Sequence, residues 1–101
     1  MIVAVGIFEL HIEYAQSLKE KRMVVKSLRD KLRRRFEIAA NEVAYQDLLQ
    51  RGRIGIAFIA SNHAAADSML EKIALFVESN AEARVNGWVS EKLDFDENIA
   101  L

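Results

Sequence analysis

The order in which the hydrophobic periodicity changes along the chain most constrains its fold. Residues 2–14 are rich in Val, Ile and Phe, and their second half alternates apolar and charged side chains, as in a strand with one wet face. Apolar residues recur every three or four positions up to residue 36 and again from Ala66 to Val77, which is the helical period. Further strand patterns occupy residues 37–44, 54–61 and 83–97. The predicted order is strand, helix, strand, strand, helix, strand.

Capping signals place the starts of the two helices. Ser17 followed by Glu20 forms a capping box, in which the hydroxyl accepts from a backbone N–H and the carboxylate reaches back to another. The first helix is therefore expected to begin there. Either Ser61 or Asn62 caps the second helix, which is expected to end near Asn80.

This order of elements predicts an α+β fold with ferredoxin-like βαββαβ topology over residues 1–101, as a single domain. In that topology a four-stranded antiparallel sheet has the strand order 4-1-3-2 and carries both helices on one face. The first and last strands have the longest patterns and lie side by side, so we expect them to project together as a ribbon. The exposed edges of these long outer strands are a candidate contact for a homodimer.

Three stretches of the sequence carry a family resemblance. They are "IVAVGIFELHIEYAQSLKEKR" at residues 2–22, "VVKSLRDKLRRRF" at 24–36 and "QDLLQR" at 46–51. Through them the chain resembles the small bacterial YlxP-like family, a domain of unknown function. The resemblance implies a ferredoxin-like fold and a genetic setting among translation and ribosome-maturation factors, and it brings no catalytic residue. Tyr45 and Leu49 stand where the family pattern has a polar residue and often Trp.

Charge is segregated along the chain, although the net charge is only −1. Residues 17–36 contain nine basic and two acidic side chains, which gives +7, and the other 81 residues contain five and thirteen, which gives −8. On a helical wheel only five of the nine form an ordered row, beside the apolar stripe. We call this set the basic row, and it consists of Lys19, Arg22, Lys26, Arg29 and Arg33.

The basic row has three interpretations. It is a phosphate-contacting surface, a solvated face that aids solubility, or an edge that docks on the acidic edge of a second copy. The second helix carries its own charged row, formed by Asp67, Glu71 and Glu78. Right-handed crossovers turn the two rows away from each other, so the basic row is expected to overhang the second strand.

The connection before the third strand adds two more basic residues, Arg51 and Arg53. Arg51 either pairs with Asp47 in ordinary turn chemistry or, with Arg53, extends the basic edge. The second alternative places both arginines near the basic row.

Several kinds of site are not expected. The chain has no Cys, so disulfides, a thiol nucleophile and a Cys-based zinc site are excluded. Glu9, His11 and Glu13 lie on one strand face, but their spacing of about 6.8 Å is too wide to converge on a metal ion, and cross-strand partners of opposite charge are expected instead. No catalytic residue, metal or cofactor is predicted. No signal peptide or membrane span is expected either, and a cytoplasmic location is assumed.

The sequence therefore predicts a non-enzymatic binding protein associated with the translation apparatus. Its partner would be structured RNA or a ribosomal subunit. The candidate nucleic-acid-binding residues are the basic row together with Arg51 and Arg53. The alternative is a protein-interaction or homo-oligomerisation module that uses exposed strand edges.

Overall fold

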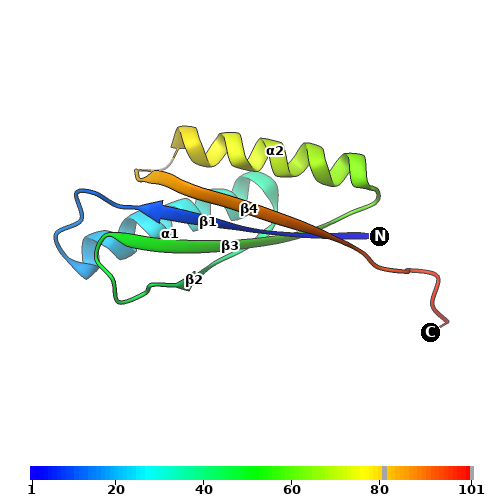
Figure 1. Cartoon of the computed structure of the whole chain (residues 1–101), viewed down its shortest axis with the longest axis horizontal. Coiled ribbons are helices and arrows are strands. Elements are labelled where there is room, and N and C mark those ends of the chain that lie inside the picture. The colour runs from blue at the N-terminus through cyan, green and yellow to red at the C-terminus, as the bar shows by residue number, and fades with distance from the viewer. Residues whose placement is uncertain (81, 101) are drawn as a thin grey trace.

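A computed structural model describes residues 1–80 and 82–100 of the chain. The elements follow the predicted order of strands and helices (Figure 1). Neither helix, within these residues, is long and apolar enough to cross a membrane. The elements are β1 (Ile2–His11), α1 (Leu18–Phe36), β2 (Ala39–Ala44), β3 (Arg51–Ala60), α2 (His63–Asn80) and β4 (Arg84–Asp94).

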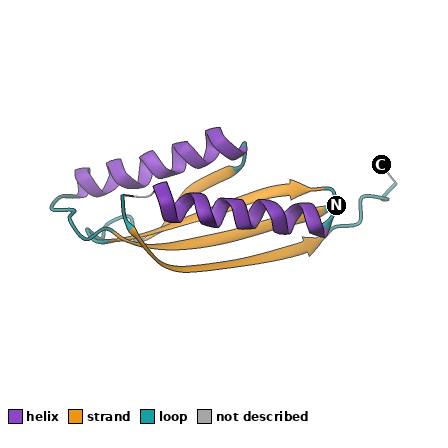
Figure 2. Ribbon diagram, turned by 90° about the horizontal axis from the view of Figure 1, so that it is seen from above, coloured by secondary structure: helices purple, strands orange, loops and turns teal. Residues whose placement is uncertain are grey.

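The four strands form one antiparallel sheet in the order β2-β3-β1-β4. Both helices lie on the same face of this sheet, and the other face has no helix over it (Figure 2). The predicted ferredoxin-like topology is confirmed.

The predicted projecting ribbon is wrong. β3 contains ten residues, as β1 does, and pairs with it from Ile2–Ala60 to His11–Arg51. The sequence prediction began β3 at residue 54, because the two arginines before it hid the strand pattern. Since β3 accompanies β1 along its whole length, β1 and β4 do not extend beyond the sheet as a pair.

Both predicted helix starts are confirmed in their caps. The Ser17 hydroxyl accepts from the Glu20 N–H at 3.1 Å, and the Glu20 carboxylate accepts from the Gln16 N–H at 2.8 Å. At α2 the cap is Asn62, whose side-chain oxygen accepts from the Ala65 N–H at 2.8 Å. The bonds to Ser17 and Asn62 satisfy backbone donors that a helix leaves free in its first turn, and the Gln16 bond fixes the residue before the cap.

The core lies between the helices and the sheet. Alternate residues of β1 face the helices, and Ala4, Phe8 and Leu10 are almost completely buried. Phe8 stacks on Trp88 of β4 with ring centroids 4.1 Å apart. The same layer contains Ile54, Ile56, Leu28, Leu32, Ile73 and Val77.

Candidate nucleic-acid interface

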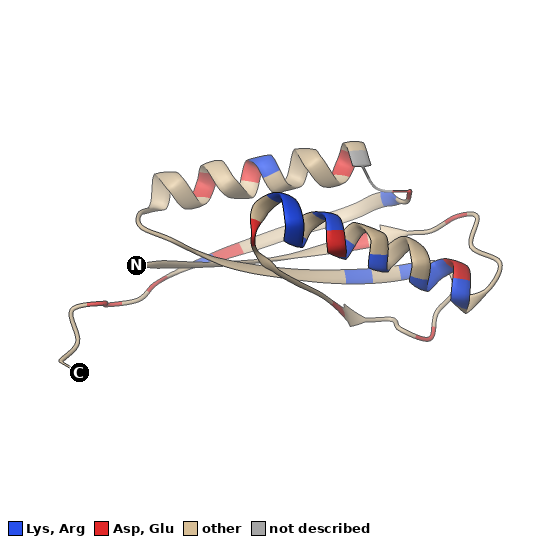
Figure 3. Ribbon diagram, turned by 180° about the vertical axis from the view of Figure 1, so that it is seen from behind, with Lys and Arg blue, Asp and Glu red and all other residues tan. Residues whose placement is uncertain are grey.

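The basic row lies along the flank of α1 next to β2. Arg33 reaches that strand, where its Nε donates to the Ala40 carbonyl at 2.9 Å and its Nη2 to Asn41 Oδ1 at 2.7 Å. At the opposite edge, Asp67 of α2 forms an ion pair with Lys92 of β4 at 2.7 Å. The predicted divergence of the basic and acidic rows is confirmed, and Figure 3 shows basic segments gathered on α1 and acidic ones on α2.

Most of the positive charge in the basic row is uncompensated. Lys19 and Lys26 are exposed, and neither forms an ion pair with any residue in the described part of the chain. Both acceptors of Arg33 are neutral, so its guanidinium is held in place without losing its charge. The row therefore combines two exposed cations with one cation fixed at the sheet edge.

Two members of the basic row have acidic neighbours. Arg22 lies 3.9 Å from Asp47, and both side chains are exposed, so water screens the pair. Arg29 has a closer partner, because its Nη2 is 3.0 Å from the Asp30 carboxylate. Arg29 is consequently the member whose charge is most reduced.

Lys21 is a buried basic residue of α1 whose structural role the sequence analysis did not predict. Its side chain is fully buried, and its Nζ donates to Glu42 Oε2 and to the Tyr45 carbonyl, each at 2.7 Å. The ammonium ties α1 to the end of β2. A signal was present in the sequence, because Lys21 precedes the buried Val25 by four positions and so shares its helix face.

Arg51 and Arg53 do not extend the basic edge, and that prediction is wrong. Both side chains lie on the face of the sheet away from the helices, where Arg51 Nη2 and Arg53 Nε donate to the Glu9 carboxylate at 2.6 and 2.8 Å. The cause is strand alternation: Ile54 faces the helices, so odd-numbered neighbours face the other way. The predicted pairing of Arg51 with Asp47 is not observed either.

Glu9 is held by these arginines as the cross-strand partner that the sequence predicted. Hydrogen bonds from Arg51 and then Arg53 lower the pKa of Glu9 below its ordinary value of 4.5. Among the described residues no group of three or more His, Cys, Asp or Glu side chains is placed to hold a metal ion.

Tyr45 contacts both the buried Lys21 on the helix side of the sheet and the arginines that hold Glu9 on the other side. Its backbone has a left-handed conformation, with φ of 65°, and its carbonyl accepts from Lys21 on the helix side. Its hydroxyl oxygen accepts from Arg51 and Arg53 at 3.2 and 3.1 Å, and both guanidiniums lie over its ring. Tyr45, one of the two residues that depart from the expected family pattern, is thus a structural link between the sheet faces.

This topology, with basic side chains along the flank of the first helix next to β2, defines a ferredoxin-like protein. Residues 3–88 match the family model described as a protein of unknown function, DUF503. The chain belongs to this family. An uncharacterised protein, YlxP, from Bacillus subtilis strain 168 is 35% identical over 68 residues, which are 67% of this chain and 74% of that protein.

Solved structures match this chain at low sequence identity. A putative antibiotic biosynthesis monooxygenase from Deinococcus radiodurans is 16% identical, with a TM-score of 0.52 over 100% of this chain and 98% of its own. A de novo designed protein with a ferredoxin fold is 16% identical, with a TM-score of 0.49 over 100% and 93%. At this identity the first likeness shows the fold alone.

Proposed function

We propose that this protein is a non-enzymatic RNA-binding protein of the translation apparatus, which contacts structured RNA, free or within a ribosomal subunit, through the basic row. The observation that carries the proposal is the fixed position of the Arg33 guanidinium and its lack of an acidic partner among the described residues. This guanidinium is oriented by two neutral acceptors on β2 and so presents an uncompensated charge at a fixed position.

The neighbouring lysines extend this charge along α1. Lys19 and Lys26 add two exposed cations to Arg33 on one flank of the helix. A helix rises about 1.5 Å per residue, so the row from Lys19 to Arg33 is roughly 21 Å long. Such a row suits successive phosphates of a nucleic-acid backbone, and no aromatic side chain belongs to it for base stacking. Binding is expected to follow RNA shape and charge and to depend little on sequence.

A binding measurement with a matched control tests this proposal. The row variant Lys19→Glu/Arg22→Glu/Lys26→Glu is compared with Arg34→Glu/Lys72→Glu/Arg84→Glu, which makes the same change in net charge outside the row. The probes are a fluorescently labelled hairpin RNA in anisotropy titrations and purified bacterial ribosomal subunits in sedimentation at low salt. We expect the row variant to lose tenfold or more in RNA affinity, and the control to lose much less.

Salt dependence gives a second readout. The slope is predicted from the four members of the basic row that have no close acidic partner within residues 1–80 and 82–100, which leaves out Arg29. They predict that log affinity falls with log salt at a slope of about −3.6 in the wild type and close to −1 in the row variant. Equal affinities and slopes for the row variant and the control would refute the proposal. Binding that no salt concentration weakens would refute it as well.

A further inference from the structure

The face of the sheet away from the helices carries a contiguous apolar surface, which we call the open-face patch. Side chains of this face come from alternate positions of all four strands, and the register confirms the shared side, because Ile7 pairs with Val89 and Val3 with Leu93. Six large apolar side chains are 37–68% exposed here. They are Val5, Ile7, Val43, Ile59, Val89 and Leu93.

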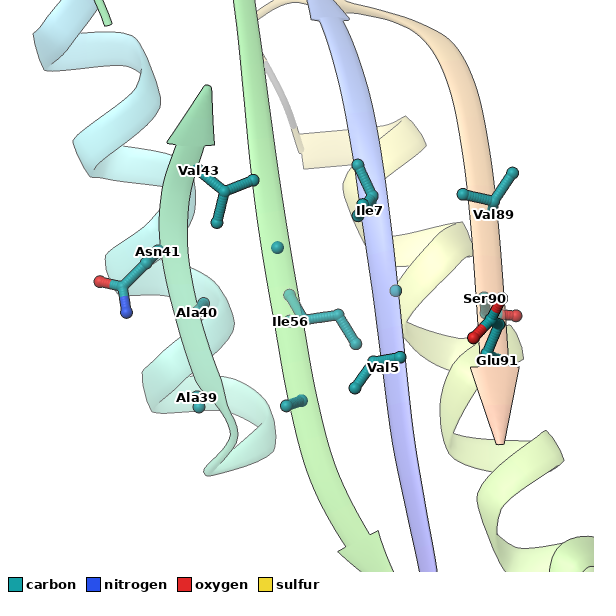
Figure 4. Close-up of a pocket in the computed structure, with 13 residues that line it drawn as sticks. Val5, Ile7, Ala39, Ala40, Asn41, Val43, Ile56, Val89, Ser90 and Glu91 are labelled. Atoms are coloured by element: carbon teal, nitrogen blue, oxygen red, sulfur yellow. The ribbon is translucent and has the colours of Figure 1, made fainter. Parts of the chain in front are cut away.

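The centre of the open-face patch is hollowed. Small residues line this hollow of about 600 Å³, including Ala39, Gly55 and Ala57, while Val43 stands on one side and Val5 on the other (Figure 4). The hollow has no helix above it, and its lining is mostly apolar, with Asn41, Ser90 and Glu91 as its polar members. Exposed apolar surface of this extent on one face is typical of a protein–protein contact.

The exposed area of the chain also exceeds that of a compact monomer. Its accessible surface is 6551 Å², whereas a monomer of 11.5 kDa is expected to expose about 5,800 Å². The radius of gyration is 14.8 Å, against about 12.7 Å for a compact domain of this length. The extended residues 95–100 account for part of this excess (Figure 1).

We propose that a second copy of this chain covers the open-face patch. The two sheets stack face to face, and a two-fold axis places each end of one sheet against the opposite end of the other. Charge on the open face favours this partner. Glu9, Arg51 and Arg53 give a net charge of +1 at one end of the face, while Glu91, which pairs with Val5, gives −1 toward the other end. A two-fold axis that exchanges the ends brings each positive end toward a negative one, twice per dimer.

This contact differs from the edge pairing that the sequence suggested, and it does not rest on RNA binding. Face-to-face stacking buries residues of the central strand β1, such as Val5 and Ile7, whereas pairing of strand edges would leave them exposed. The basic row lies on the helix side of the sheet, so stacking leaves one row free on each copy.

Molar mass as a function of concentration tests the dimer. Sedimentation velocity of the full chain is expected to show twice 11.5 kDa at high concentration. Val5→Lys should raise the dimer dissociation constant roughly tenfold or more, because the ammonium would be buried in the interface. Leu75→Lys is the matched control, since Leu75 on α2 is 60% exposed and lies outside the patch. A wild type that stays at 11.5 kDa at every concentration would overturn the proposal.

Cysteine labelling keeps the test decisive if Val5→Lys fails to fold. The chain has no Cys, so a single Val5→Cys or Leu75→Cys variant reports one position. Maleimide labelling of Val5→Cys should slow as protein concentration rises, while that of Leu75→Cys should not. A dimer in which Val5→Cys is labelled as fast as in the monomer would overturn the proposal and indicate edge pairing.

The orientation has its own test. Glu91→Lys should raise the dissociation constant, and high salt should shrink the difference from the wild type, because exposed charges are screened. An unchanged dissociation constant in Glu91→Lys at low salt would overturn the proposed orientation, in which opposite ends of the two sheets lie together.

Discussion

The two faces of the sheet are built from the same four strands and differ in what covers them. On the covered face, Ala4 and Phe8 of β1 are at most 1% exposed beneath the helices. On the open face, their neighbours Val5 and Ile7 are about 40% exposed, although they are equally apolar. A central strand that is apolar on both faces is typical of a sheet with a packed layer on each side. In the described chain only the helices form such a layer, and they lie on one face.

The Lys21–Glu42 pair on the covered side and the Glu9–Arg51–Arg53 cluster on the open face differ in their access to water. On the covered side Lys21 is enclosed completely and contacts Glu42. On the open face Glu9 keeps about one-fifth of its side chain exposed, and Arg51 keeps about half. The low dielectric around the enclosed pair makes a missing partner far more costly there than on the wet face.

The largest effect is expected from Lys21→Met. The substitution leaves the Glu42 carboxylate and the Tyr45 carbonyl without their shared donor, and it releases the end of β2 from α1. We expect the free energy of unfolding to fall by about 3 kcal/mol, measured by urea denaturation. The control is Lys26→Met on the exposed flank of the same helix, where a change within about 0.5 kcal/mol is expected. Similar values for the two variants would contradict the structural role of Lys21.

Two glycines, one facing each side of the sheet, give the next comparison. A methyl group at Gly6 would overlap the ring of Trp88, which is stacked on Phe8 and has little room to move. At Gly55 the nearest atom would be a methyl of the exposed Val43, 3.0 Å away, which can turn aside. Gly6→Ala should therefore cost about 1–3 kcal/mol of unfolding free energy, whereas Gly55→Ala should lie within about 0.5 kcal/mol of the wild type. Dilute samples in urea denaturation isolate the monomer, and a larger cost at Gly55 would show that the open face is already packed.

The sequence was sufficient to predict the fold because its periodicities are local. The order of elements and the helix caps follow from spacing within single segments. The direction of the basic row follows from its helix positions once the right-handed crossovers of the fold are added. The errors arose where one segment's placement depends on another. Arg51 and Arg53 were assigned to a loop, and their face became clear only once β3 was seen to pair with β1 from Arg51 onward.

Lys21 illustrates the second kind of error. Counting charges grouped it with the scattered basic residues of α1, although its helix position belongs to the buried stripe. A buried lysine is stable only when acceptors surround its ammonium, and these come from Glu42 and Tyr45, more than twenty residues away. The pattern within α1 shows where the side chain points, and only the tertiary structure shows why that position can be basic.

The smallest effect, and the sharpest in pH, is expected at Glu9 on the open face. Hydrogen bonds from Arg51 and Arg53 depress its folded-state pKa below 4.5, so the cluster contributes stability above that pH and loses it as the pH falls through the folded pKa. Glu9→Gln should lower the melting temperature slightly at neutral pH, by less than Gly6→Ala does, and the gap from the wild type should close below about pH 4.5. Glu97, whose pKa is lowered by the N-terminal amine, titrates in the same window in both proteins and so cancels in the comparison. A gap that stays constant down to about pH 3 would mean that the ionised carboxylate does not stabilise this face, and that shape alone aligns the arginines over Tyr45.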